Sequence, residues 1–118
     1  MQYIILLLSL ISINAHAEYT KSDFLEDAAT VSLIADWGTT LNIEDYADQG
    51  AYETNVIMGK HPTRNQVHAY FASVIAIHWL INRRYQGTKQ RDWLNMLTLG
   101  VELNAVSNNY RLGLRMDF

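Results

Sequence analysis

Residues 65–82 read NQVHAYFASVIAIHWLIN, and these 18 residues carry no formal charge. At about 100° per residue, the bulkier side chains gather on one helical face, which comprises Val67, Phe71, Val74 and His78. The opposite face holds the small side chains of Ala69, Ala72, Ser73 and Ala76. Pro62 and Thr63 mark a start, so the pattern predicts a helix over residues 63–86. Its small-residue face would let a partner helix approach closely.

This helix fits two environments. An uncharged stretch of this length lies at the lower edge of the range for a membrane span, about 17–25 residues, and the sequence favours a span over residues 67–81. The positive-inside rule would then place the following basic cluster in the cytoplasm; it consists of Arg83, Arg84, Lys89 and Arg91. In a soluble protein the same helix would lie at the centre of a bundle.

Two further helices are expected, over residues 22–40 and 92–107. Thr20 or Ser22 can cap the first, and its apolar residues recur at spacings of three and four. Gly100 weakens the prediction of the second. The chain from residue 18 to residue 118 is long enough for one small domain. The predicted fold class is therefore mainly α, with three helices after a signal peptide.

Residues 1–17, MQYIILLLSLISINAHA, have the form of a secretory signal peptide. An apolar run from Tyr3 to Ile13 precedes the small-residue site Ala15-His16-Ala17, the arrangement that a signal peptidase accepts. The absence of Lys and Arg before the run departs from the usual pattern and leaves cleavage open. The sequence contains no Cys, which excludes a lipid-anchored Cys and disulfides. We therefore expect export to the inner membrane or periplasm of a Gram-negative-type cell.

Charge is divided unevenly along the chain. Residues 18–62 contain two basic and nine acidic side chains, a net charge of −7, whereas residues 63–118 contain seven basic and three acidic ones, a net charge of +4. This asymmetry predicts that the two halves face each other or face different compartments. A nucleic-acid partner is not expected, because the basic residues are few and an exported protein would not meet nucleic acid.

Two segments lie outside the predicted helices. Residues 42–63 form a polar connection rich in turn-forming residues, and its length predicts that it is partly helical or functional. Residues 109–118 alternate apolar and polar side chains and end in Phe118, which predicts a short C-terminal β-strand or an extended segment. The alternation resembles the last strand of outer-membrane barrel proteins, but no other segment alternates as such a barrel would require.

The most distinctive stretch combines Asp36-Trp37-Gly38-Thr39-Thr40 with Glu53-Thr54-Asn55 and His61-Pro62. Over residues 36–71 it resembles small uncharacterised membrane-associated proteins of bacteria and their phages, although Val56 stands where that pattern has Pro. The resemblance implies a membrane context and no particular activity. Glu53 and Asn55 can close a turn or cap a helix; the functional alternative is a polar cluster that binds a cation or a partner. Its candidate members are Asp36, Glu53, Asn55, His78 and Glu102.

Catalytic and metal-binding patterns are weak. His68 and His78 lie about 15 Å apart along one helix, too far to bind one ion, and no known ligand spacing is present; we expect no cofactor. His78, on an apolar face, is expected to be a hydrogen-bonded core residue; at membrane depth its expected partner would be Glu102 or Asp36. A triad of Ser73, His78 and Asp36 lacks a nucleophile elbow. The sequence thus predicts an exported, membrane-associated envelope protein that acts by interaction; the alternatives are a soluble periplasmic binding module and a small metal-dependent enzyme.

Overall fold

A computed structural model describes residues 18–118 of the protein. Three long helices make up most of this part: α2 (Lys21–Thr40), α3 (Arg64–Arg84) and α4 (Lys89–Arg111). A short 3-10 helix, η1 (Glu44–Gln49), lies in the connection between α2 and α3, as the length of that connection suggested. The prediction of a mainly helical, three-helix arrangement is confirmed. The predicted signal peptide lies outside the described residues.

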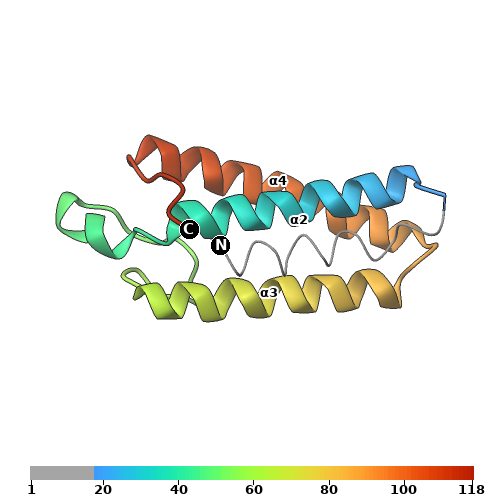
Figure 1. Ribbon diagram of the computed structural model, residues 1–118, viewed down its shortest axis with the longest axis horizontal. Helices are drawn as coiled ribbons and strands as arrows, with labels where there is room; N and C mark the ends of the chain where they lie inside the picture. Colours follow the sequence, from blue (N-terminus) through green and yellow to red (C-terminus); the bar gives the residue numbers. More distant parts are fainter. Residues whose placement is uncertain (1–17) are drawn as a thin grey trace.

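The helices are arranged around α2 (Figure 1). α2 packs extensively along α4 and, over a smaller area, along α3. α3 and α4 run antiparallel after the turn at Gly87, but their backbones lie farther from each other than from α2 (Figure 1), and side chains near the turn join them. One side of the three-helix arrangement is therefore open between α3 and α4.

Side-chain caps set where the helices begin. Thr20 Oγ1 accepts a hydrogen bond from Asp23 N, and the Asp23 carboxylate accepts one from Thr20 N, which forms a capping box. Thr63 and Gln66 repeat the arrangement at α3. Thr88 Oγ1 accepts a hydrogen bond from Arg91 N, so α4 begins earlier than the predicted residue 92. It also continues past the predicted end at residue 107, because the helix runs through Gly100 to Arg111.

The capping box of α2 yields a stability prediction. Replacing Thr20 with Ala removes the hydroxyl acceptor for Asp23 N, and we expect a loss of about 1 kcal/mol in the free energy of unfolding. Urea denaturation followed by circular dichroism would measure it. Ser22→Ala is the matched control, because Ser22 lies inside the helix and Thr20 is the cap residue. Equal losses in both variants would contradict the assigned cap.

The apolar core occupies the end of the arrangement that contains the C-terminus of α2 and the N-terminus of α3. Trp37 is its centre: its ring stacks on Phe71 with a centroid distance of 6.3 Å and meets Phe118 edge-on at 5.5 Å. Trp37 Nε1 donates a hydrogen bond of 3.2 Å to His68 Nδ1. The other core residues surround this group; they are Leu33, Leu41, Ile43, Ala51, Val67, Ile75 and Leu114.

The predicted C-terminal strand is not confirmed. Residues 109–111 of the alternating segment belong to the last turn of α4, residues 112–113 form a turn, and residues 114–118 follow without regular secondary structure. The alternation instead serves packing, because Leu114 is buried and the side chains of Met116 and Phe118 lie over Gly38. A single backbone hydrogen bond, from Asp117 N to Gly38 O, ties the tail to α2 in place of a strand ladder. A Cβ at Gly38 would lie 2.6 Å from Phe118, so this glycine allows the close approach.

The structure does not support the interpretation of residues 67–81 as a membrane span. Within residues 18–118, no helix has both the length and the apolar character that crossing a bilayer requires. The buried side of α3 includes the polar side chains of His78 and Asn82, which reduces its mean hydropathy.

Candidate functional site

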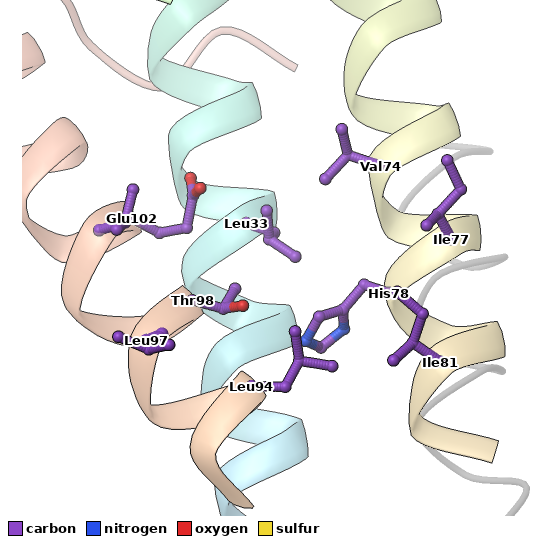
Figure 2. A pocket seen from close by; sticks show the side chains of 10 residues that line it. Leu33, Val74, Ile77, His78, Ile81, Leu94, Leu97, Thr98 and Glu102 are labelled. Carbon is purple, nitrogen blue, oxygen red and sulfur yellow. The ribbon is translucent and has the colours of Figure 1, made fainter. Parts of the chain in front are cut away.

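The open side between α3 and α4 forms an apolar groove with a volume of about 360 Å³. Figure 2 shows α3 and α4 as its two walls, with Leu33 of α2 at its floor. Its lining residues are mostly branched aliphatic side chains; they are Leu33, Val74, Ile77, His78, Ile81, Leu94, Leu97, Thr98, Val101 and Glu102. We call this feature the α3–α4 groove. An apolar cavity with a few polar side chains is the usual form of a binding site.

A pair of carboxyl groups connects α2 to α4 at one end of the groove. Asp36 of α2 and Glu102 of α4 lie beside each other, and each affects the pKa of the other. Asp36 Oδ1 also accepts hydrogen bonds from Thr40 Oγ1 at 3.0 Å and from Asn109 Nδ2 at 2.9 Å. Glu102 Oε2 is buried and receives no hydrogen bond from a donor in residues 18–118. Burial of two adjacent carboxyl groups disfavours the state in which both are ionised, so the pair favours holding one proton.

The surroundings place this proton on Glu102. Asp36 Oδ1 accepts hydrogen bonds from two donors, which stabilise a negative charge on it, whereas Glu102 Oε2 accepts none from residues 18–118. Burial and the adjacent Asp36 raise the pKa of Glu102 to about 8. Burial also raises the pKa of Asp36, although its hydrogen bonds oppose that change. Near neutral pH the pair therefore carries about one negative charge, located mainly on Asp36.

Three further polar residues adjoin this pair. Burial raises the pKa of Glu53, and the charge of Asp36 adds to the effect. Burial likewise raises the pKa of Tyr70, which interacts electrostatically with Glu102, Asp36 and Glu53. Asn55 Nδ2 donates a hydrogen bond to the Tyr70 hydroxyl. Four of the five candidate residues thus lie in one neighbourhood, which we call the carboxyl cluster.

Glu53 and Asn55 also close a turn, as the sequence suggested. Glu53 Oε1 accepts a hydrogen bond of 2.8 Å from Asn55 N, and Asn55 Oδ1 accepts one of 2.9 Å from Ile57 N. These bonds hold the chain in the shape that brings Asn55 to Tyr70. The same residues therefore have a local structural role and a place beside the carboxyl pair.

His78 does not join the carboxyl cluster: it is a buried, hydrogen-bonded core residue, and Asn82 is its neighbour in place of the Glu102 or Asp36 expected at membrane depth. Its ring instead lies beside Asn82 and Asn95 in the interior. Burial lowers the pKa of His78, which favours the neutral ring. Asn82 lies one helical turn after His78 on α3, which places its amide group beside the His78 ring.

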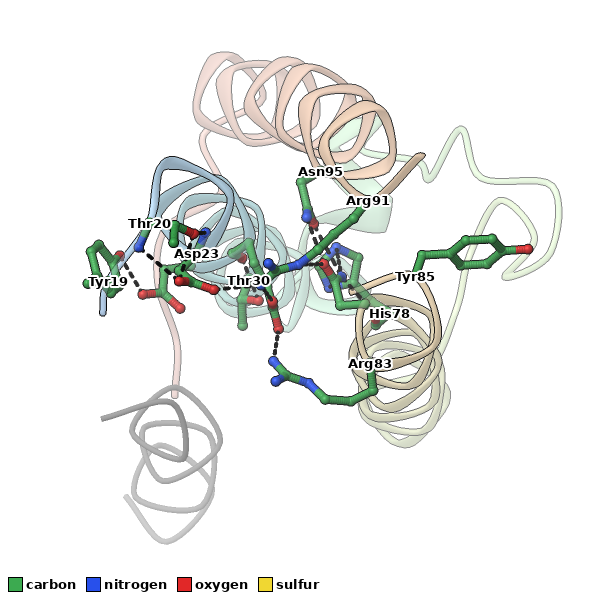
Figure 3. A network of polar contacts seen from close by, with 12 residues as sticks. Tyr19, Thr20, Asp23, Thr30, His78, Arg83, Tyr85, Arg91 and Asn95 are labelled. Carbon is green, nitrogen blue, oxygen red and sulfur yellow. Dashed lines mark hydrogen bonds and ion pairs between the residues drawn. The ribbon is translucent and has the colours of Figure 1, made fainter. Parts of the chain in front are cut away.

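A buried polar network fills the interior at the α3–α4 turn (Figure 3). Asn82 and Asn95 are fully buried, and Asn95 Nδ2 donates to Asn82 Oδ1 at 2.7 Å. Arg91 Nε donates to the same oxygen at 3.3 Å. Arg91 also forms ion pairs with Asp23, at 2.8 Å, and with Glu26, and Glu26 pairs with Arg83 at 2.7 Å. The interior at this end is thus held by polar contacts.

These ion pairs explain the uneven charge of the sequence. Asp23 and Glu26 belong to the acidic half, and Arg83 and Arg91 belong to the basic half. At the other end, Arg64 pairs with Asp117 at 2.6 Å. None of the ion pairs within residues 18–118 includes Asp36, Glu53 or Glu102. The acidic and basic halves of the sequence therefore face each other at the α3–α4 turn. The acidic residues of the carboxyl cluster have no basic partner among these ion pairs.

The small-residue face of α3 lies on the surface. Ala69, Ala72, Ser73 and Ala76 are all exposed, and the Ser73 hydroxyl donates a hydrogen bond to Ala69 O. Ser73 and buried His78 consequently lie on different faces of α3, so the structure does not assemble the triad considered with Asp36. Among residues 18–118, no three His, Asp or Glu side chains are placed to hold a metal ion.

The sequence pattern did not indicate several residues of the carboxyl cluster and of the buried polar network. Glu26 and Arg91 looked like ordinary surface charges at helix starts, and Asn109 lay in the predicted strand. Asn82 gave the clearest missed signal, because it follows His78 by four residues on the bulky face of α3. A polar pair at that spacing on an otherwise apolar helix indicates a buried polar contact.

Comparisons of the chain with protein-family models, with curated proteins and with solved structures found no match. The fold and the groove are therefore interpreted from the residues of this chain alone.

Proposed function

We propose that this protein acts in the cell envelope by interaction, and that its α3–α4 groove receives an apolar helix of a partner protein. The observation that carries the proposal is the aliphatic groove between α3 and α4, two helices that both pack on α2 and bond to each other near their connecting turn through Asn82, Asn95 and Arg91. An amphipathic helix laid into such a groove is a recurrent mode of protein recognition. The form of residues 1–17 supports an envelope location.

The groove has the properties that a helix-binding site requires. Its walls are antiparallel helices, and each contributes aliphatic side chains one turn apart, including Val74, Ile77 and Ile81 on α3. Leu97 and Val101 of α4 lie one turn apart on the other wall and are 65 % and 63 % exposed. Covering aliphatic surface of this kind contributes roughly 25 cal/mol per Å² buried. A fourth helix would complete the bundle on its open side.

The test introduces a charge into the groove without disturbing the core. We expect Leu97→Glu to weaken the binding of an amphipathic peptide with a leucine face by at least about tenfold, because a charged group would be desolvated on docking. Leu103→Glu is the matched control, since Leu103 lies on the same helix, is 55 % exposed and does not line the groove. Fluorescence anisotropy with a labelled peptide would measure both affinities.

Two results would overturn the proposal. One is equal peptide affinity in wild type and Leu97→Glu, with circular dichroism showing that both are folded. The other is binding to phosphatidylcholine vesicles that Leu97→Glu abolishes, with no binding of the peptide, because the groove would then take lipid. Carbonate extraction and N-terminal sequencing of the mature chain test the envelope location separately: an uncleaved chain recovered from the cytoplasm would contradict it.

A further inference from the structure

We infer that the helix received by the α3–α4 groove carries one basic side chain among its apolar ones, and that this side chain pairs with the Glu102 carboxyl group, which lines the groove and lacks a hydrogen-bond partner for Oε2 in residues 18–118. This inference rests on the proposed function and names the chemistry of the partner.

The charges around the groove point to a cation. Glu102 is the acidic residue among the lining residues, which include neither Lys nor Arg; burial lowers the pKa of His78, which also lines the groove, and so favours its neutral ring. It belongs to none of the ion pairs of residues 18–118. The titratable groups that face it are Asp36 from α2, Glu53 from the loop before α3 and Tyr70 from α3. All of them are acidic or neutral, so a partner with a positive charge would complement this end of the groove.

The carboxyl pair also offers a specific place for that charge. Glu102 Oε2 is buried and has no N–H or O–H donor in residues 18–118, although Glu102 lines the groove. A Lys or Arg N–H placed between the two carboxyl groups would supply a charge-assisted hydrogen bond, which is stronger than a neutral one. Asp36 would keep its bonds from Thr40 and Asn109. The partner would thereby turn a pair that holds one proton into two ionised carboxylates around one cation.

This exchange predicts a measurable release of protons. Below the raised pKa of Glu102, about 8, the pair holds one proton in the free protein. When a cation takes its place, Glu102 ionises and the proton leaves to the buffer. Binding of a basic helix should therefore release up to about one proton near neutral pH, and its affinity should increase as the pH rises toward about 8.

The experiment compares two synthetic amphipathic peptides of about 18 residues, roughly 27 Å of helix. Both have leucine on the inward face and glutamine on the outward face; one carries a central Lys on the inward face and the other norleucine. Calorimetry at neutral pH in two buffers of different ionisation enthalpy gives the affinity and the number of protons released. We expect the Lys peptide to bind at least about tenfold more tightly and to release a proton, and the norleucine peptide to release none.

Two variants test whether Glu102 causes the preference for the Lys peptide and the proton release. Glu102→Gln should remove both the preference for Lys and the proton release, while Asp45→Asn, which removes an exposed carboxylate of η1, should retain both. Equal binding of the two peptides without proton release would overturn this inference and leave the proposed groove function intact. A preference for Lys that survives in Glu102→Gln would also overturn it. Failure of both peptides to bind would instead contradict the proposed function.

Discussion

Replacing Arg91 with Ala is expected to destabilise the protein by about 3–5 kcal/mol, because the variant leaves buried carboxylates without their main partner. The Arg91 side chain is only 4 % exposed, and its guanidinium joins Asp23 and Glu26 of α2 to Asn82 of α3. Arg83 still pairs with Glu26 in the variant, which places the expected loss toward the lower value. The free energy of unfolding of small domains is about 5–15 kcal/mol in total, so the variant would be close to unfolding at room temperature.

Urea denaturation at neutral pH would measure this loss. Arg84→Ala is the matched control, because Arg84 lies at the same turn but is exposed and belongs to no ion pair of the described chain; its effect should stay within about 0.5 kcal/mol. If Arg91→Ala were as stable as Arg84→Ala, the polar network would not hold this end of the molecule together.

The same contact predicts an acid-sensitive contribution to stability. The hydrogen bond from Arg91 lowers the pKa of Asp23 from 3.8 to about 2. A carboxylate whose pKa is lowered by folding stabilises the protein above the unfolded pKa, and this stabilisation disappears as the pH falls from about 4 to about 2. Wild type should lose stability over that interval more steeply than Arg91→Ala, in which Asp23 has lost its partner.

Glu102→Gln is expected to make the protein more stable at about pH 8, by about 1–2 kcal/mol, and to change its stability little at about pH 5. The sign of this stability change follows from the direction in which folding shifts the pKa of Glu102. Folding raises the pKa of Glu102 from 4.5 to about 8, so the folded state retains a proton that the unfolded state loses. The stability of wild type therefore falls as the pH rises through that interval. Glutamine is neutral at every pH and avoids this loss.

The expected gain is smaller than the full pKa shift would give, because Glu102 is only partly buried and solvent screens the repulsion. Thermal denaturation of wild type and variant across this pH range would measure the difference. Asp45→Asn removes an exposed carboxylate outside the cluster and should show no such pH-dependent gain. A Glu102→Gln variant that is destabilised equally at both pH values would contradict a proton held by Glu102 beside Asp36.

The helices of this protein could be predicted from local patterns. Apolar residues at spacings of three and four indicated all three long helices, and Thr20 and Thr63 marked two of their starts. The C-terminal strand was predicted wrongly, because alternation in residues 109–118 is compatible with a last helical turn followed by a packed tail. Residues 18–118 contain no strand that could pair with this segment, and its contacts with Gly38 decided the outcome.

The candidate site was only partly predictable. Acidic residues in unusual positions indicated Asp36, Glu53 and Glu102, and the structure brings them together. The sequence could not separate His78 from them, nor place Tyr70 and Asn109 beside them, because these contacts join different helices. Likewise Arg91 and Glu26 are 65 residues apart in the chain, and nothing in either segment alone predicts their pairing.

The sequence by itself thus determined the helical elements and their caps, because hydrogen bonds and side-chain spacing within a helix involve residues at most about four apart. Only the tertiary structure decided which polar side chains meet and that the backbones of α3 and α4 remain apart. Those features depend on the angle and register at which α2 packs against each of the other helices. The proton held by the pair of Asp36 and Glu102 and the open α3–α4 groove both follow from that packing.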